Sequence, residues 1–364
     1  DRLQVWHVFV AAALGALFST VHFTAFYAMM PLIVPEKHLG RANGLMQMTQ
    51  ALQIAAPVLA GALLGTIGLK GVVLIDLCTM VVGVSLLAAA RLAPDATAAP
   101  GSGERVTVRE DLGHGWRTLR ARPGLWQLAV LFGGFNFLFA MAGVLVQPLI
   151  LSFSSPATLG VLMFVGGSGL FVGSIVMSTW GGPKRRVRGI IALLVWGGVA
   201  LFLHGIAPSA WLIGVVAPLF LFTIPILNGS SMTLIQTGVP AESLGRVVAT
   251  TRMIGQAAAP VAYVVAGPLA DHLAEPAMAA DGLLAGSVGA LIGTGPGRGI
   301  ALIFLGIGAA MLVLAAVAAR LPRLRALDEP TTAESATTES TTTEAATDKQ
   351  ATTDKEATHA PQPA

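Results

Sequence analysis

The chain has 364 residues, of which 54% are hydrophobic and 11% are charged, and its net charge is +3. Ordinary soluble domains carry charge on about 25% of their residues, so this composition excludes a water-exposed globule with a polar coat. The basic residues are dispersed among short loops, and we therefore expect no nucleic-acid partner. The single cysteine, Cys78, excludes a disulfide framework, and its apolar surroundings predict a small core residue.

Four long segments contain no Asp, Glu, Lys or Arg, at 8–33, 42–69, 123–183 and 189–241. A helix needs about 20 apolar residues to cross a membrane, and continuous apolar runs favour helices over barrel strands. We therefore expect an all-α membrane protein. Turn signals between the runs predict nine transmembrane helices, which fall in chain order near 6–33, 43–67, 71–91, 125–151, 157–180, 189–207, 210–237, 247–270 and 299–320.

The Lys and Arg residues are concentrated in alternate loops, at 37–41, 91–122, 184–188, 246–252 and 320–325. Positively charged loops stay on the cytoplasmic side of a membrane. This bias predicts a multi-pass protein of the cell (inner or plasma) membrane whose C-terminus is cytoplasmic.

An internal repeat connects two distant parts of the chain. Residues 34–41 read VPEKHLGR and residues 239–246 read VPAESLGR, while AAPV at 55–58 recurs at 258–261 and places Pro57 and Pro260 at similar depths. An even number of predicted spans separates the copies, so the repeats share one orientation, as in transporters with parallel repeats. The repeating unit has six helices, and we expect three further helices before Asp1.

The repeat predicts four regions. They are a partial N-terminal bundle of three helices (1–92), a central cytoplasmic loop (93–123), a C-terminal six-helix bundle (124–322) and a disordered cytoplasmic tail (323–364). In the central loop, Thr107 and Glu110 form a capping-box pattern, and Leu112, Trp116 and Leu119 recur at helical spacing. This pattern favours a helix on the membrane surface, with an ordinary solvated linker as the alternative.

Two six-helix repeats with a long central loop resemble the major facilitator superfamily. Residues 31–45, PLIVPEKHLGRANGL, are similar to the loop before the fifth helix in the macrolide-efflux-like branch of drug:proton antiporters, and GGPKRR at 181–186 resembles the basic loop that forms a gate latch. The antiporters carry Gly-Pro and Gly-Gly pairs where this chain has Ala56-Pro57 and Ala60-Gly61.

The resemblance implies a secondary transporter that exports a small hydrophobic or amphiphilic compound by alternating access, driven by protons. Its expected partners are membrane lipid, a small-molecule substrate and protons, and we expect a monomer without a cofactor. A lipid or lysolipid translocator and a non-transporting remnant are the alternatives. A membrane-embedded enzyme is the rival from another class, but the ionisable His22, Asp76 and His204 are scattered, so we expect no enzyme. A Walker-type nucleotide loop is absent, which disfavours an ATP-driven pump.

The helices that line the central cavity in this family predict the substrate contacts. Six polar residues fall on them: His22, Tyr27, Asn136, Gln147, Asn228 and Ser231. Each of them can instead join helices by hydrogen bonds. Gln47, Gln50 and Gln53 share one helical face, which predicts either a polar wall or a helix contact.

The remaining candidates concern movement and coupling. Asp76 is an acidic residue inside an apolar run, which makes it the coupling candidate, with structural hydrogen bonding near the outer surface as the alternative. Pro57 and Pro260 are candidate hinges or static kinks. The candidate cytoplasmic gate residues are Arg41, Lys184, Arg185, Arg186 and Arg246.

Three further assignments are structural. Asn43, just inside a predicted helix, is expected to be a cap, and His204 is expected to be structural. The glycines Gly166, Gly169 and Gly173 predict close helix packing.

Overall fold

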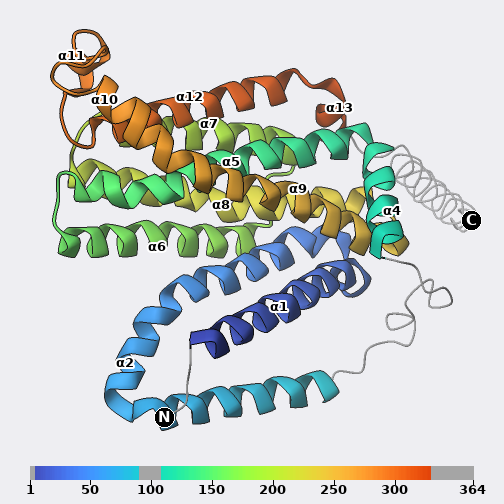
Figure 1. The fold of residues 1–364 in the computed structure, drawn as a ribbon. Helices are drawn as coiled ribbons and strands as arrows, with labels where there is room; N and C mark the ends of the chain where they lie inside the picture. Colours follow the sequence, from blue (N-terminus) through green and yellow to red (C-terminus); the bar gives the residue numbers. More distant parts are fainter. Residues whose placement is uncertain (1–4, 90–107, 329–364) are drawn as a thin grey trace, which may run out of the picture.

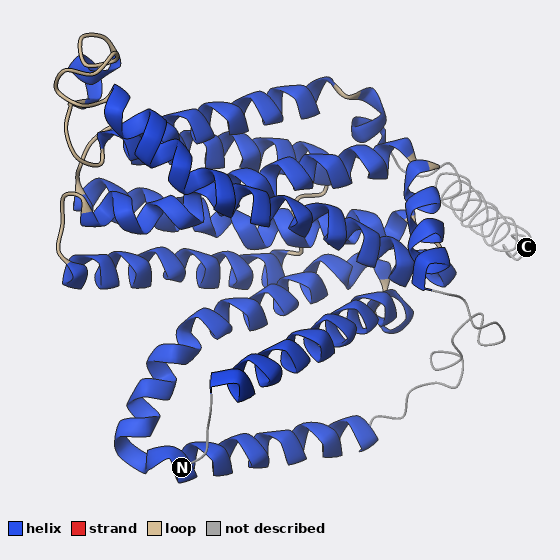
Figure 2. Ribbon diagram, viewed as in Figure 1, coloured by secondary structure: helices blue, strands red, loops and turns tan. Residues whose placement is uncertain are grey.

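The computed structural model describes residues 5–89 and 108–328, and every regular element in this part is a helix (Figures 1 and 2). Two predicted regions lie largely outside the described residues. They are the tail, apart from its first residues, and the first part of the central loop, which includes Thr107.

The C-terminal half is a bundle of long helices that run side by side (Figure 1). They are α5 (Pro123–Leu151), α6 (Pro156–Trp180), α7 (Arg186–His204), α8 (Ala210–Gly238), α9 (Ala241–Pro268) and α12 (Arg298–Arg320). Local sequence sets their ends. The Ser155 side chain accepts a hydrogen bond from the backbone N–H of Thr158 at the start of α6, and Gly181 ends that helix with a φ of 84°.

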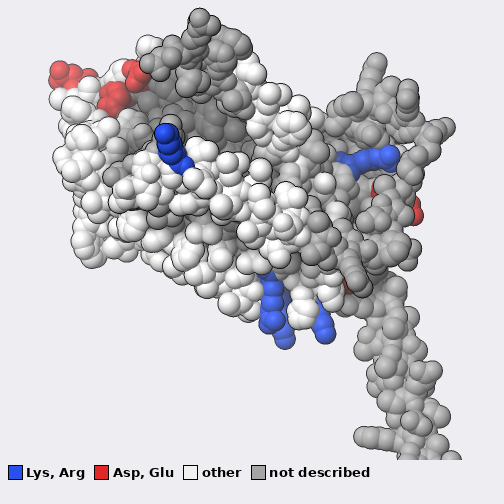
Figure 3. Space-filling view, turned by 90° about the horizontal axis from the view of Figure 1, so that it is seen from below, with Lys and Arg blue, Asp and Glu red and all other residues white. Residues whose placement is uncertain are grey.

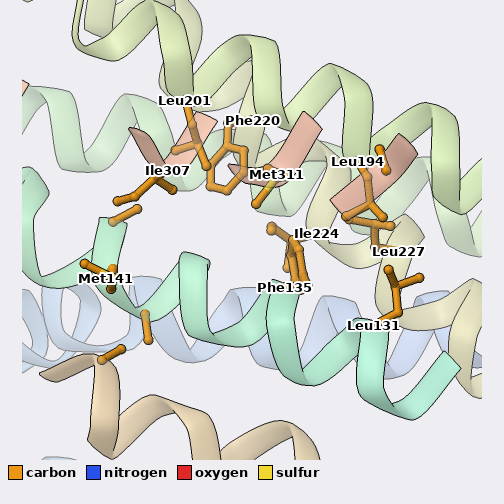
Figure 4. Close-up of a cluster of buried hydrophobic side chains, with 14 of the residues drawn as sticks. Leu131, Phe135, Met141, Leu194, Leu201, Phe220, Ile224, Leu227, Ile307 and Met311 are labelled. Atoms are coloured by element: carbon orange, nitrogen blue, oxygen red, sulfur yellow. The ribbon is translucent and has the colours of Figure 1, made fainter. Parts of the chain in front are cut away.

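Six helices of the described part are long and apolar enough to cross a membrane, and all six belong to this bundle, with α9 counted as far as Ala277. The prediction of an all-α membrane protein is therefore confirmed, whereas the expected count of nine is not. Figure 4 shows the core between these helices, to which Phe135 of α5, Phe220 of α8 and Met311 of α12 contribute. Each of these three side chains is buried.

Glycines bring α6 and α8 close together. A Cβ atom on Gly169 would collide with the carbonyl oxygen of Pro218, and one on Gly173 would collide with that of Phe222. A Cβ on Gly166 would touch the Leu221 side chain at 3.5 Å. The expected packing role of these three glycines is confirmed.

The first part of the chain forms α1 (Val5–Ile33) and α2 (Glu36–Ala89). Gly68 interrupts α2 with a φ of 65° and a ψ of 177°, between the second and third predicted spans. Both repeat-related helices begin earlier than expected, α2 at Glu36 rather than near 43 and α9 at Ala241 rather than near 247. The VPxxxLGR motif therefore forms the start of each helix and is not a loop.

The segment of α2 after Gly68 lies away from the C-terminal bundle, with α1 between them (Figure 1). Its apolar side chains are exposed, with Leu74 at 62% and Leu86 at 67% of their full accessibility. Cys78 lies on this segment and is also exposed. The expectation that Cys78 is a core residue was wrong, because an apolar run in a membrane protein can face outward.

Short elements complete the two ends of the bundle. At one end lie α4 (Val108–Arg120), α13 (Pro322–Arg325) and the 3₁₀ turn η2 (Ala326–Asp328). Asp328 accepts hydrogen bonds from the backbone N–H groups of Val187 and Arg188 at 2.8 and 3.0 Å, which caps α7. In α4, the Arg120 guanidinium lies 5.4 Å from the Trp116 ring and 5.0 Å from the Trp126 ring of α5.

The opposite end contains the π-helical turn η1 (Leu269–Ala274), α10 (Glu275–Ala277) and α11 (Val288–Ile292). Glu275 accepts hydrogen bonds from the backbone N–H groups of Gly297 and Ile300 at the start of α12, at 3.2 and 3.1 Å. Buried His204 bonds the Ala200 carbonyl at 2.8 Å and stacks on Phe304, which supports its expected structural role.

Candidate functional site

A cavity of about 550 Å³ lies between the first two helices and the C-terminal bundle. Its wall is mixed, with amide and hydroxyl groups beside aromatic and aliphatic side chains. The lining residues are Tyr27, Asn43, Gln47, Gln50, Phe132, Asn136, Phe139, Leu170, Ile224, Pro225, Asn228, Gly229, Ser231, Met232, Ile235, Thr251, Arg252, Gly255 and Gln256. A volume of this size suits a drug-sized molecule.

The structure brings four of the six predicted cavity residues together at this wall: Tyr27, Asn136, Asn228 and Ser231. Asn136 donates a hydrogen bond from its Nδ2 to the carbonyl oxygen of Phe132 at 2.8 Å. The other two predicted residues, His22 and Gln147, are exposed and do not line the cavity.

Gln47 and Gln50 of α2 also line the cavity, whereas the side chain of Gln53 lies outside the described part. Asn43 is not a helix cap, because α2 begins at Glu36, a full two turns earlier along the chain. Asn43 instead lies buried at one edge of the cavity.

Hydrogen bonds between the two halves close this edge. The Asn43 amide donates to Thr233 Oγ1 at 3.0 Å and to Gln236 Oε1 at 2.7 Å, both on α8. Gln236 in turn donates to the carbonyl oxygen of Tyr27 on α1 at 3.1 Å. Among the described side chains, Asn43 Oδ1 is one of the few buried polar atoms without a partner.

Backbone contact reinforces the closure. A Cβ atom on Gly40 would collide with the carbonyl oxygen of Gly181, and one on Gly44 would collide with the backbone of Ser178. The start of α2 therefore lies directly against the end of α6. Figure 1 shows that the two first-half helices stay near the bundle at this end and diverge from it toward the other.

The predicted gate residues surround this contact. Arg41 packs against Gly181, and Arg186 donates to the Gly181 carbonyl oxygen at 3.2 Å. The acidic groups that act on Arg186 are Asp328 and Glu36, the latter from the first half. Lys184 and Arg185 are exposed beside them. Arg246 lies in the second turn of α9, away from this contact, where its backbone lies against Gly115 of α4.

Basic residues are concentrated at the gate end of the molecule. The gate end carries the basic residues just named together with those of α4 and α13. Figure 3 shows acidic side chains gathered near the left edge, at the opposite end, while most of the remaining face carries no charge. The acidic residues at the opposite end include Asp271, Glu275 and Asp281.

Neither the hinge candidate Pro260 nor the coupling candidate Asp76 lines the cavity. Pro260 is exposed inside α9, and the side chain of Pro57 lies outside the described part. Asp76 is exposed on the α2 segment after Gly68, where its carbonyl oxygen accepts a hydrogen bond from Thr79 Oγ1 at 2.8 Å. It does not line the cavity.

Arg252 lines the cavity although the sequence pattern groups it with the loop residues. It lies eleven residues after Ala241, the first residue of α9. At about 1.5 Å per residue this is about 16 Å along the helix, or about three turns. The signal in the sequence was its spacing of almost two turns beyond Arg246, which is more than a loop residue requires.

Long apolar helices around a central, partly polar cavity define a membrane transporter. The sequence matches the Major Facilitator Superfamily over residues 3–263. The chain belongs to this superfamily, as the internal repeat and the basic loops predicted. The family points to a transporter rather than an enzyme.

Several efflux proteins are similar to the chain. Macrolide efflux protein A of Streptococcus pyogenes is 25% identical over 283 residues, which cover 75% of this chain and 68% of that protein. The Enterococcus faecalis protein of the same name is 25% identical over 271 residues, or 71% of this chain and 81% of the relative. Multidrug efflux pump Tap of Mycolicibacterium fortuitum is 27% identical over 339 residues, or 90% and 75%. No solved structure matches significantly. The resemblance to the macrolide-efflux-like branch is confirmed.

Proposed function

We propose that this protein exports small hydrophobic or amphiphilic compounds across the cell membrane by alternating access, in exchange for protons. The observation that carries the proposal is the central cavity, which is closed at one end by contacts between the two halves of the chain. A cavity that is sealed at one end is the arrangement from which a substrate leaves toward the other.

The orientation of the cavity in the membrane follows from the charge of the two ends. The closed end carries the basic loops and begins both copies of the repeated motif. Because positively charged loops stay in the cytoplasm, this end is cytoplasmic and the cavity faces outward. The same orientation places the C-terminus in the cytoplasm and α4 at the cytoplasmic membrane surface. Residues 1–92 and 124–322 then act as the two moving bundles.

Transport by the full-length protein in everted vesicles from a pump-deficient bacterium tests the proposal. After energisation, both the proton gradient and the uptake of a panel of lipophilic compounds are followed. The proposal predicts substrate-dependent proton release that a protonophore abolishes. Well-inserted protein that moves no protons with any compound would refute it, and uptake of lysolipid alone would favour a lipid translocator.

Asp76 is the proposed coupling group of this chain. Because Asp76 does not line the cavity, substrate and proton would occupy different places. Asp76→Asn removes the titratable charge at nearly constant volume, and we expect it to lower substrate-dependent proton release by about tenfold or more. Asp271→Asn, at an exposed acid on η1, is the matched control and should leave release unchanged. Unchanged release in Asp76→Asn would exclude this role.

A further inference from the structure

The cavity wall carries one charge sign only. Arg252 is a cation on this wall, and no Asp or Glu is found among the cavity residues of the described part. The other polar groups there are amides and hydroxyls, such as Asn136, Asn228 and Gln256. A ligand that enters this cavity therefore meets a net positive charge.

The donors of Arg252 are available. Its guanidinium carbon lies 5.3 Å from the Phe23 ring and 5.4 Å from the Tyr27 ring, both on α1. Within residues 5–89 and 108–328, Arg252 makes neither a side-chain hydrogen bond nor an ion pair with a carboxylate. Rings cover the face of a guanidinium, whereas its five N–H donors point outward in its plane, where a carboxylate or phosphate binds with two parallel hydrogen bonds.

The depth of Arg252 gives this observation its weight. Arg252 lies about three turns inside a helix that is apolar enough to cross a membrane. A charged residue within such a helix is costly to maintain and is expected to face water or a partner of opposite charge. The Lys and Arg residues that set the topology of a membrane protein lie in its loops, so topology does not explain an arginine at this place in α9. The two aromatic contacts keep the guanidinium at the wall but do not neutralise it.

The remainder of the wall suits an apolar body. Phe132, Phe139, Leu170, Ile224 and Met232 line the same cavity as Arg252. Burial of apolar and aromatic surface there would supply most of the affinity, while the guanidinium would select the head group.

We propose that the substrates are anionic amphiphiles, with a carboxylate or phosphate head bound by Arg252 and an apolar body against the aromatic wall. This inference rests on the proposed export function. It names Arg252 as the residue that sets specificity for the head group.

Three probes that differ only in the head group test this inference. They are 1-pyrenebutyrate, its neutral amide and 1-pyrenebutylamine, and their binding to the full-length protein is measured in phosphatidylcholine nanodiscs after subtraction of empty discs. We expect the wild-type protein to bind the butyrate about tenfold or more tightly than the amide, since hydrogen bonds to a charged group carry this much affinity. The amine should bind most weakly.

Arg252→Gln should remove this preference by weakening the butyrate to the level of the amide, while the affinity for the amide stays within about twofold. Arg320→Gln removes one positive charge outside the cavity and should leave the order of the three probes unchanged. Arg252→Lys should keep the order with a smaller difference, because an ammonium lacks the planar fork. Equal binding of butyrate and amide by the wild type would overturn the inference. A loss in Arg252→Gln that is equal for all probes would also overturn it and assign Arg252 a structural role.

A pyrene-labelled lysophosphatidylglycerol separates two sources of the head group. Displacement of butyrate by this lipid in the wild type but not in Arg252→Gln would identify a lipid phosphate, and no displacement would identify free acids. The binding test of the substrate class and the transport test of the proposed export can each fail without the other. An Arg252-dependent preference without transport would contradict the proposed export, whereas proton-coupled export of neutral compounds without that preference would contradict only the substrate class.

Discussion

Two glycine-mediated helix contacts in this molecule differ in what surrounds them. Gly169 and Gly173 join α6 to α8 inside the C-terminal bundle, beside buried Leu162, Ile213 and Phe220. Gly40 and Gly44 join α2 to α6 across the two halves, beside the amide hydrogen bonds of Asn43. The first contact belongs to a continuous apolar core, and the second lies beside polar groups at the gate end.

This difference indicates which contact persists during transport. Separation of α6 from α8 would expose backbone and apolar core surface along much of two helices, which is costly. Separation of the first half from the bundle at the gate end breaks the backbone contact of α2 with α6. It also breaks the few hydrogen bonds between neutral groups that join Asn43 of α2 to α8, each with a net contribution of about 0.5–1.5 kcal/mol. For the proposed transport cycle, we therefore expect the C-terminal bundle to move as one body and the halves to part at the gate end.

The largest effect is expected inside the bundle. Gly169→Leu places a side chain where even a Cβ collides with the Pro218 carbonyl, so α6 and α8 must separate. We expect a loss of about 1–3 kcal/mol of stability or more, seen as a lower thermal unfolding temperature and reduced yield. Gly160→Leu on the same helix is the control, because a Cβ there meets no atom within 4 Å. Equal unfolding temperatures for the two variants would contradict the account of this contact.

A different effect is expected between the halves. Gly44→Val collides with the backbone of Ser178 and should hold the gate end apart without disrupting the core of the bundle. We expect transport to fall about tenfold or more, while the unfolding temperature changes less than in Gly169→Leu. Gly306→Val on α12 is the control, since a Cβ there also meets no atom within 4 Å. Full transport by Gly44→Val would show that closure of this end is not required.

The class of fold could be predicted because it depends on composition and patterns over long stretches of sequence. Apolar runs, alternate basic loops and the repeated VPxxxLGR motif specify membrane helices and a family. The packing glycines of α6 followed from the same logic, since small residues at helical spacing allow close approach.

The site was predicted less well because it depends on which face of each helix turns inward. Tyr27, Asn136, Asn228 and Ser231 lie at the cavity, but His22 and Gln147 on the same helices α1 and α5 do not. Composition places all six in apolar spans without distinguishing their faces. The cross-half bonds of Asn43 join residues 190 and 193 positions apart, which no local pattern encodes. The spacing of Arg252 from Arg246 sets it apart from the loop, but its contacts with α1 at the cavity are tertiary.

The reversible closure of the gate end is tested most directly by labelling a single cysteine in the cavity from each side of the membrane. Asn228→Cys in a Cys78→Ser background is treated with a membrane-impermeant thiol reagent in right-side-out and in everted vesicles. The closed gate end predicts faster labelling in right-side-out vesicles, and the addition of Gly44→Val should reverse the order. Equal labelling from both sides, or an order that Gly44→Val does not change, would contradict closure of the cavity by this contact.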